Sequence, residues 1–236
     1  MAFNFYTGEV LLVDKPYTWT SFQAVNKLKH AVKHHPSLIV EGQKVKPKIG
    51  HAGTLDPLAT GLLIICTGKK TKTINDLMGL DKEYTGTIVL GATTPCYDLE
   101  KPIDATYPTE HITEQLLHEK VQSFIGDIEQ VPPLFSAIMV DGKRAYTLAR
   151  AGEDVELKAR SITIFEFEIT RFEMPEVDFR IVCSKGTYIR SIARDLGLAL
   201  NSGGHLTALR RTRIGNFKVT DAVDPLALAD QVNSGA

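Results

Sequence analysis

The sequence lacks a hydrophobic run long enough to cross a membrane, and it lacks a cysteine pattern typical of cross-linked proteins. Its longest uninterrupted apolar run, residues 61–66, is far shorter than the roughly 18–20 apolar residues that span a bilayer. Residues 1–8 show no basic segment followed by an apolar stretch, so we expect no secretory signal. Cys66, Cys96 and Cys183 lie far apart and include no Cys-x-x-Cys. We therefore expect free thiols in a reducing, cytoplasmic setting, with neither a disulfide framework nor a zinc site.

Net charge is almost absent, because 27 Lys and Arg face 28 Asp and Glu. With 43% hydrophobic and 8% aromatic residues, this balance excludes wholesale disorder and a polybasic tail. The charge is nevertheless uneven. Residues 14–72 carry ten lysines against three acids, and residues 180–218 carry eight basic residues against one acid, a net of +7 each. Residues 98–129 (net −6) and 153–178 (net −5) compensate. If the basic segments meet in the fold, they form a polyanion-binding face; separate solvated faces are the alternative.

Apolar patterns and turn residues predict strands and helices that alternate without a regular βαβ repeat. This favours a mixed α+β sheet, and because no Pro/Gly/Ser-rich linker divides the chain, we expect one domain over residues 1–236. An exposed loop is expected at 36–48. Strands are expected at 10–13, 62–67, 84–90, 138–140, 162–169, 177–184 and 206–214, and helices at 21–34, 70–78, 112–125, 145–151 and 188–200.

Spacing within these elements predicts which side chains are buried. In the first helix, with Thr20 or Ser21 as the N-cap, the spacing predicts one apolar face, made by Phe22, Val25, Leu28 and Val32. In the strand at 162–169, alternation places three apolar side chains on one face, namely Phe165, Phe167 and Ile169. In the helix at 188–200, the inward residues are Ile189, Ile192, Ala193 and Leu196.

Common cofactor and metal motifs are missing. Gly68-Lys69 resembles part of a phosphate-binding loop, but Leu63 stands where that motif needs glycine and Lys70 where it needs Ser or Thr. No Gly-x-Gly-x-x-Gly opens a helix, and there is no Gly-x-Ser-x-Gly. His30 and His34 lack the intervening glutamate of a zinc protease. Nothing here supports a nucleotide cofactor, a metal or a Ser/Cys nucleophile.

The segment Gly50-His-Ala-Gly-Thr-Leu-Asp-Pro-Leu-Ala-Thr-Gly61 is the most unusual part of the chain. Three glycines and a proline in twelve residues indicate a rigid turn, and Pro57 disfavours helical backbone at Asp56. The turn presents one carboxylate, flanked by His51 and Thr54. An Asp before Pro is also common as a simple turn former.

This segment resembles the signature of the TruB-type tRNA pseudouridine synthases, and further blocks occur in the order found in that family. They span roughly residues 10–219 and read Asp14-Lys-Pro16 with Thr20-Ser21, Lys82-Glu-Tyr84, Gln130-Val-Pro-Pro-Leu-Phe-Ser-Ala-Ile138, Gly142-Lys-Arg-Ala-Tyr146, Cys183-Ser-Lys-Gly-Thr-Tyr-Ile-Arg190 and Leu209-Arg-Arg211.

The resemblance implies the pseudouridine synthase fold, whose mixed sheet is largely antiparallel and flanked by helices. It implies that Asp56 is the catalytic carboxylate, that Tyr84 stacks on the target base and that Arg190 pairs with Asp56. The residues implied in substrate binding are Lys15, His51, Lys82, Asp98, Tyr188 and Leu209.

The implied reaction converts uridine to pseudouridine in the T loop of tRNA, at position 55. It breaks an N-glycosidic bond and rejoins the ring through carbon, so it needs no cofactor. The carboxylate either attacks covalently or removes a sugar proton. The base must first be flipped out of a folded RNA arm. The chain is too short for the C-terminal RNA-binding PUA domain of longer relatives, so we expect weaker binding of distal tRNA and a monomeric enzyme.

Three other interpretations remain open. The protein could be an RNA chaperone whose help in tRNA folding matters more than catalysis. It could be a guide-RNA-dependent relative inside a ribonucleoprotein, although it has no extended basic tail. It could also be a nucleoside hydrolase, which would normally use a second acid or a metal.

Overall fold

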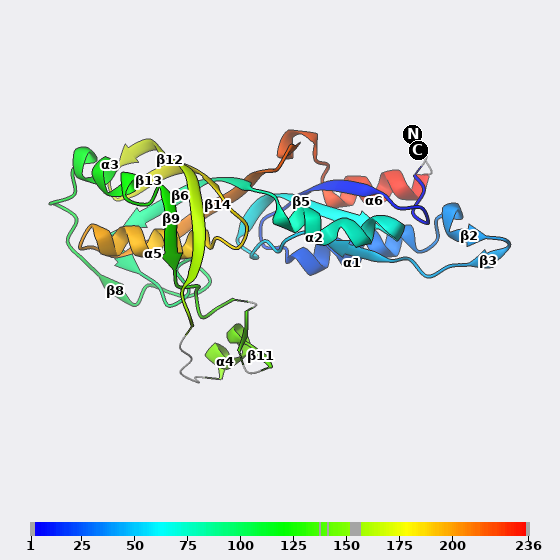
Figure 1. Cartoon of the computed structure of the whole chain (residues 1–236), viewed down its shortest axis with the longest axis horizontal. Coiled ribbons are helices and arrows are strands. Elements are labelled where there is room, and N and C mark those ends of the chain that lie inside the picture. Colours follow the sequence, from blue (N-terminus) through cyan, green and yellow to red (C-terminus); the bar gives the residue numbers. More distant parts are fainter. Residues whose placement is uncertain (1–2, 137, 141, 152–156, 235–236) are drawn as a thin grey trace. The chain divides into compact units, whose positions relative to one another are not determined.

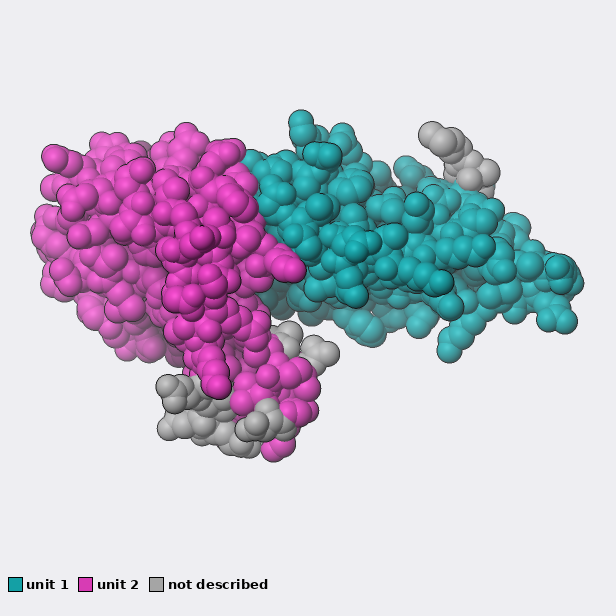
Figure 2. Space-filling view, viewed as in Figure 1, with its two compact units in different colours: residues 1–84, 210–236 teal, residues 85–209 magenta. Residues whose placement is uncertain are grey.

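The structure, a computed structural model, describes residues 3–136, 138–140, 142–151 and 157–234. The chain divides into two compact units (Figure 2): unit 1 contains residues 1–84 and 210–236, and unit 2 contains residues 85–209. The expectation of one domain over residues 1–236 stays a prediction. Three parts of the sequence predictions lie outside the described residues, namely Ala137, Asp141 and residues 153–156 of the acidic stretch.

The predicted mixed, largely antiparallel sheet flanked by helices is confirmed (Figure 1). Nine strands form one sheet in the order β1-β5-β14-β6-β13-β12-β9, with β4 beside β5 and β15 beside β14. The β1–β5, β4–β5, β9–β12, β12–β13 and β14–β15 pairs are antiparallel. These strands are β1 (Val10–Lys15), β4 (Ile49–His51), β5 (Ala59–Thr67), β6 (Lys82–Leu90), β9 (Gly126–Gln130), β12 (Arg160–Glu173), β13 (Glu176–Cys183), β14 (Gly204–Ile214) and β15 (Phe217–Lys218).

Short pairs and helices complete the fold. The two-stranded pairs join β2 (Ile39–Val40) to β3 (Gln43–Lys44), β7 (Ala92–Thr93) to β8 (Ala105–Thr106) and β10 (Met139–Val140) to β11 (Lys143–Arg144). The α-helices are α1 (Ser21–Val32), α2 (Ile74–Gly79), α3 (Glu114–Gln122), α4 (Ala145–Arg150), α5 (Ile189–Ala199) and α6 (Pro225–Ser234). Three 3₁₀-helices are η1 (Pro36–Leu38), η2 (Gly68–Thr73) and η3 (Val219–Asp221).

In unit 1, β5 is buried on both faces. Leu63 and Ile65 belong to one core cluster with apolar residues of α1 and α6. Leu62 and Ile64 belong to another, against which residues of α2 pack. Because successive side chains of a strand alternate between faces, this explains why 62–67 is a continuous apolar run rather than an alternating one.

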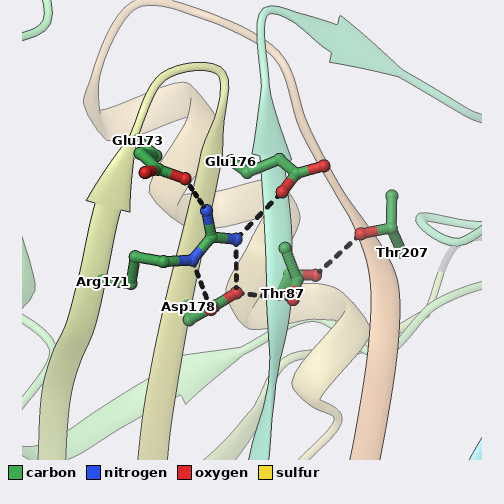
Figure 3. Close-up of polar contacts among 6 residues, drawn as sticks. All are labelled: Thr87, Arg171, Glu173, Glu176, Asp178 and Thr207. Atoms are coloured by element: carbon green, nitrogen blue, oxygen red, sulfur yellow. Dashed lines mark hydrogen bonds and ion pairs between the residues drawn. The ribbon is translucent and has the colours of Figure 1, made fainter.

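In unit 2, β12 and β13 form a long hairpin whose end carries an ion cluster (Figure 3). Arg171 donates to Glu173, to Glu176 Oε2 at 2.9 Å and to Asp178 Oδ2 at 2.7 Å. Asp178 also accepts from Thr87 Oγ1 of β6 at 2.6 Å. The hydrogen bonds from Arg171, and to a smaller extent the one from Thr87, lower the pKa of Asp178. The cluster ties three neighbouring strands together at one end.

Two predictions of buried faces are partly wrong. Phe22 is 71% exposed, because at 100° per residue it lies about 120° around the helix from the buried Leu28. Phe165 is 52% exposed, whereas Phe167 is buried as predicted. A register shift after Ile164 interrupts the alternation, so the buried face changes from Ile162 and Ile164 to Phe167. The inward face predicted for α5 is confirmed.

Most of the segment 36–48 is exposed, as expected, but it is not a plain loop, because it contains η1 and the β2–β3 hairpin. Leu38 is only 2% exposed and belongs to the core cluster of α1 and α6. The turn uses Glu41 and Gly42, both with positive φ (51° and 77°), as a two-residue hairpin of this kind requires. The hairpin is therefore anchored at its base.

The three cysteines are buried and are not part of a disulfide. Burial raises the pKa of the Cys66 and Cys96 thiols. Both thiols are therefore poor nucleophiles at neutral pH.

Candidate active site

The loop that carries Asp56 connects β4 to β5, and Ser21 of α1 anchors it through two hydrogen bonds. Ser21 Oγ accepts from Leu55 N at 2.8 Å and donates to Leu55 O at 3.1 Å. Leu55 itself is 3% exposed. The residue before Asp56 is thus fixed through its backbone and its side chain, while the Asp56 side chain stays partly exposed.

Arg211 of β14 holds the same loop from a second side. Its side chain is buried, and its three nitrogens donate to Leu62 O (2.8 Å), Gly53 O (3.1 Å) and Thr54 O (3.4 Å). The close approach needs glycine at Gly61, where φ is +101° and a Cβ atom would lie 2.3 Å from the Arg211 carbonyl oxygen. A buried guanidinium directed entirely at carbonyl groups stiffens the loop.

Lys15, at the end of β1, supports the residue after Asp56. The side chain is fully buried, and its Nζ donates to Trp19 O (2.5 Å), Pro16 O (3.0 Å) and Pro57 O (3.3 Å). Burial lowers the pKa of Lys15 to about 8; the negative charge of Asp56 raises it and the positive charge of Arg211 lowers it. An ammonium group and a carboxylate therefore interact at the base of the loop.

His51, the last residue of β4, lies at the start of the loop. Burial lowers its pKa, and the positive charge of Arg211 acts in the same direction against a backbone hydrogen bond at Gly53. The imidazole is therefore neutral at pH 7. Unit 1 thus places three predicted site residues at one loop: Lys15, His51 and Asp56. Contact of His51 with substrate stays a prediction.

In unit 2, Arg190 and Asp98 form a buried ion pair. Arg190 Nε lies 3.7 Å from Asp98 Oδ2, and the two side chains are 6% and 8% exposed. The guanidinium also donates to Phe135 O at 2.9 Å and to Cys96 O at 3.2 Å. Burial of such a pair fixes the orientation of the guanidinium. The predicted pairing of Arg190 with Asp56 concerns residues of different units and stays a prediction.

The backbone of Tyr188 is fixed by Gln130, a buried residue. Tyr188 N donates to Gln130 Oε1 at 2.8 Å, and Gln130 Nε2 donates to Tyr188 O at 3.1 Å. Ser191 Oγ reaches Val131 O at 2.8 Å. The Gln130 block of the sequence therefore positions the start of α5, on which Arg190 lies.

The other predicted residues lie on β6 and β14. Tyr84 of β6 is 9% exposed, and Leu209 of β14 is partly exposed. Lys82, also on β6, is buried, and its Nζ donates to Met78 O at 2.7 Å and to Leu80 O. Contact of Lys82, Tyr84, Tyr188, Leu209, Asp98 or Lys15 with substrate stays a prediction.

Sequence reasoning missed the residues that position the site. Ser21, Gln130 and Arg211 carry no chemistry in the predicted reaction, and their contacts are made with backbone atoms of distant segments. All three nevertheless stand inside the quoted sequence blocks. Those blocks were the one signal that could have identified them.

In the described part of the chain, no three His, Cys, Asp or Glu side chains gather where they could hold a metal ion. Among the same residues, no helix is both long enough and apolar enough to span a membrane.

Residues 41–189 match the family described as TruB family pseudouridylate synthase (N terminal domain), and residues 190–234 match the tRNA pseudouridylate synthase B C-terminal domain. The chain belongs to the TruB family. It is therefore an enzyme, and the reaction class of TruB pseudouridylate synthases is isomerisation.

The TruB relatives include proteins named tRNA pseudouridine synthase B. The one from Flavobacterium johnsoniae is 62% identical over 221 residues, which cover 94% of each chain. The one from Bacteroides fragilis strain YCH46 is 54% identical over 231 residues, which cover 98% of this chain and 96% of that protein.

Solved structures with the same fold include the chain of a Cbf5–Nop10–Gar1 complex (29% identity, TM-score 0.70). Another is an H/ACA RNP bound to a substrate RNA (27% identity, TM-score 0.67). The alignments cover 96% of this TruB chain but only 55% and 54% of those chains.

Proposed function

We propose that this enzyme converts uridine 55 in the T loop of tRNA to pseudouridine, with the Asp56 carboxylate as the catalytic group. The relatives named tRNA pseudouridine synthase B, at 62% and 54% identity, support tRNA as the substrate. The similarity to the chains of the Cbf5–Nop10–Gar1 complex and of the H/ACA RNP is lower, at 29% and 27% identity, so a role inside a ribonucleoprotein is less well supported. We further propose a cytoplasmic enzyme that acts as a monomer.

The observation that carries this proposal is the anchoring of the residues on both sides of Asp56. Leu55 is held by Ser21 through two hydrogen bonds, and Pro57 O accepts from Lys15. A carboxylate between two fixed backbone segments keeps its position when substrate arrives. Because small displacements of a reacting group can cost about a hundredfold in rate, such anchoring is expected for a catalytic side chain.

The other site residues have supporting roles in this proposal. Tyr84 stacks on the flipped base and returns about 1–3 kcal/mol of the few kcal/mol that flipping costs. Arg190 pairs with Asp56 and orients its carboxylate, while Asp98 holds Arg190. His51, Tyr188 and Leu209 line the space of the extruded nucleotide. Covalent attack by Asp56 and removal of a sugar proton both need the anionic carboxylate.

The test is the Asp56→Asn variant with an unmodified tRNA transcript. We expect no pseudouridine at position 55, because the amide can neither attack nor accept a proton, and tRNA affinity within about threefold of wild type. Asp76→Asn, an exposed acid on α2, is the control and should keep full activity. Pseudouridine formation by Asp56→Asn at the wild-type rate would overturn the proposal. Free uracil among the wild-type products would indicate a hydrolase instead.

A further inference from the structure

The β2–β3 hairpin leads into a segment with three lysines at alternate positions, Lys44, Lys46 and Lys48, here called the lysine row. All three side chains are exposed, whereas the intervening Val45 and Pro47 are partly buried. In an extended segment, alternate residues point to the same side and lie roughly 6–7 Å apart. This separation is similar to that of neighbouring phosphates along one nucleic acid strand.

The lysine row has no acidic partner among the described residues, unlike six of the arginines of this protein. In the part of the chain that the structure describes, none of its three ammonium groups is within ion-pair distance of a carboxylate. Between residues 15 and 55, the only acid is Glu41, at the hairpin turn. By contrast, six arginines each pair with a carboxylate, namely Arg171, Arg180, Arg190, Arg194, Arg210 and Arg213.

The row has a polar neighbour at one end and further lysines at the other. Lys44 Nζ donates to His34 Nδ1, two residues beyond the end of α1, at 3.5 Å. Lys48 O accepts from Gly68 N at 2.9 Å, which brings the row close to Lys69 and Lys70, both exposed. A positive surface therefore extends from Lys44 along the row to Lys69 and Lys70 of η2, all within unit 1.

The backbone of the row is fixed to the core, and the row lies close in sequence to the candidate active site. Val45 N donates to Leu38 O at 2.8 Å, and Leu38 is fixed in the core. The row continues directly into β4, which ends at His51. Lys48 and Lys44 precede His51 by three and seven residues, so they lie at most about 10 and 23 Å from it along the chain. A nucleic acid strand bound along the row would therefore extend toward the loop of Asp56.

We propose that the lysine row binds the phosphate backbone of the RNA substrate and guides it to the Asp56 loop. This inference rests on the proposed function for the identity of the RNA, but the row itself needs only a phosphate strand. Unpaired ammonium groups on a preformed edge suit phosphates without sequence preference. The row thus contributes affinity and leaves the chemical step unchanged.

The test replaces all three lysines, in Lys44→Gln/Lys46→Gln/Lys48→Gln, and measures steady-state kinetics and the salt dependence of binding with a full-length tRNA transcript. We expect KM to rise about tenfold or more while kcat stays within twofold. The slope of log affinity against log salt should fall by roughly 2–3, because each phosphate contact contributes about 0.7–0.9. The control, Lys101→Gln/Lys158→Gln/Lys218→Gln, removes the same charge from exposed positions elsewhere and should change KM less than threefold.

Cross-linking gives a second readout. Since the three natural cysteines are buried, Lys46→Cys can be labelled selectively with a photo-reactive group. We expect cross-links from this position to tRNA and few from Lys101→Cys. Unchanged KM and salt slope in the triple variant, with no cross-links from position 46, would overturn the proposal even if the wild type forms pseudouridine. If the wild type modifies no tRNA but the row still controls RNA binding, the proposed function fails and the row stands.

Discussion

Burial lowers the pKa of two basic side chains at the Asp56 loop, Lys15 and His51, but only Lys15 is charged at neutral pH. Lys15 is fully buried but donates to three carbonyl groups, and its pKa falls to about 8, so it remains largely charged at neutral pH. His51 has a pKa lowered by burial and by the positive charge of Arg211, so it is neutral. These two environments therefore give a charged Lys15 and a neutral His51 at the same loop.

The lowered pKa of His51 predicts a specific pH dependence of stability. In the unfolded chain His51 titrates near 6.5 and in the folded protein at lower pH. As pH falls below 6.5, the unfolded state binds the proton first, so this contribution to stability is present above pH 6.5 and is lost on acidification. We expect the free energy of unfolding of wild type to fall more between pH 7.5 and 5 than that of His51→Gln, measured by urea unfolding. Equal losses in both proteins would contradict the prediction.

At the scale of the element, the Asp56 loop depends on Arg211. Lysine keeps the charge at this position but has one nitrogen in place of the three that reach Leu62, Gly53 and Thr54. We expect Arg211→Lys to lower the free energy of unfolding by about 2–4 kcal/mol, because buried carbonyl groups lose their donors. We also expect kcat to fall at least tenfold with little change in KM, since the loop is displaced in the bound complex.

Two measurements separate positioning from general stability. Arg213→Lys, two residues further along β14, changes an arginine whose partner is the partly exposed Asp81 and should cost less than about 1 kcal/mol. Arg211→Met removes the charge, so the pKa of His51, followed by NMR, should rise in that variant and stay unchanged in Arg211→Lys. An unaltered kcat in Arg211→Lys would show that Arg211 only stabilises the fold.

Sequence patterns predicted best those elements whose signals are local. Thr20 or Ser21 was predicted as the N-cap, and it is Thr20 that caps α1, through a capping box with Gln23. The inward face of α5 was predicted from helical spacing alone. The prediction for Phe165 failed because a bulge arises from pairing between strands, which the alternation within one strand does not contain.

The same distinction applies to the candidate site. Asp56 could be predicted because the glycines and the proline that shape its loop are sequence neighbours. The groups that hold the loop, Ser21 and Arg211, lie 34 and 158 residues from their partners Leu55 and Gly53. They bind carbonyl and amide groups, which every residue has. No residue type marks such a partner, so only the folded chain reveals it.

For the whole molecule, the near-zero net charge conceals separate roles for basic residues. Most arginines are bound to carboxylates or, like Arg211, to carbonyl groups, and they are part of the fold. The lysines of residues 27–48 are exposed and number six against one acid. A neutral protein can therefore present a local positive surface. Whether the basic segments 14–72 and 180–218 meet in the fold stays a prediction.

The two units raise a question about cooperativity that can be tested. Unit 1 is built from residues 1–84 and 210–236, and unit 2 is continuous. The division falls within β6 and within β14, so each strand supplies residues to both units. Partial melting of one unit would have to break these strands in the middle. We therefore expect the chain to unfold in one transition, as the prediction of a single domain requires.

Leu228→Ala on α6 tests this expectation. Leu228 is 4% exposed in the core of α1 and α6, so its truncation should cost about 2–5 kcal/mol. Leu226→Ala, on the same helix but 47% exposed, should cost less than about 1 kcal/mol. In native-state hydrogen exchange, the slowest amides of β12 and β13 in unit 2 should then lose as much protection as those of β1 in unit 1, because both exchange through global unfolding. Unchanged protection in β12 and β13 would mean that the units fold independently, and the prediction of one domain over residues 1–236 would be wrong.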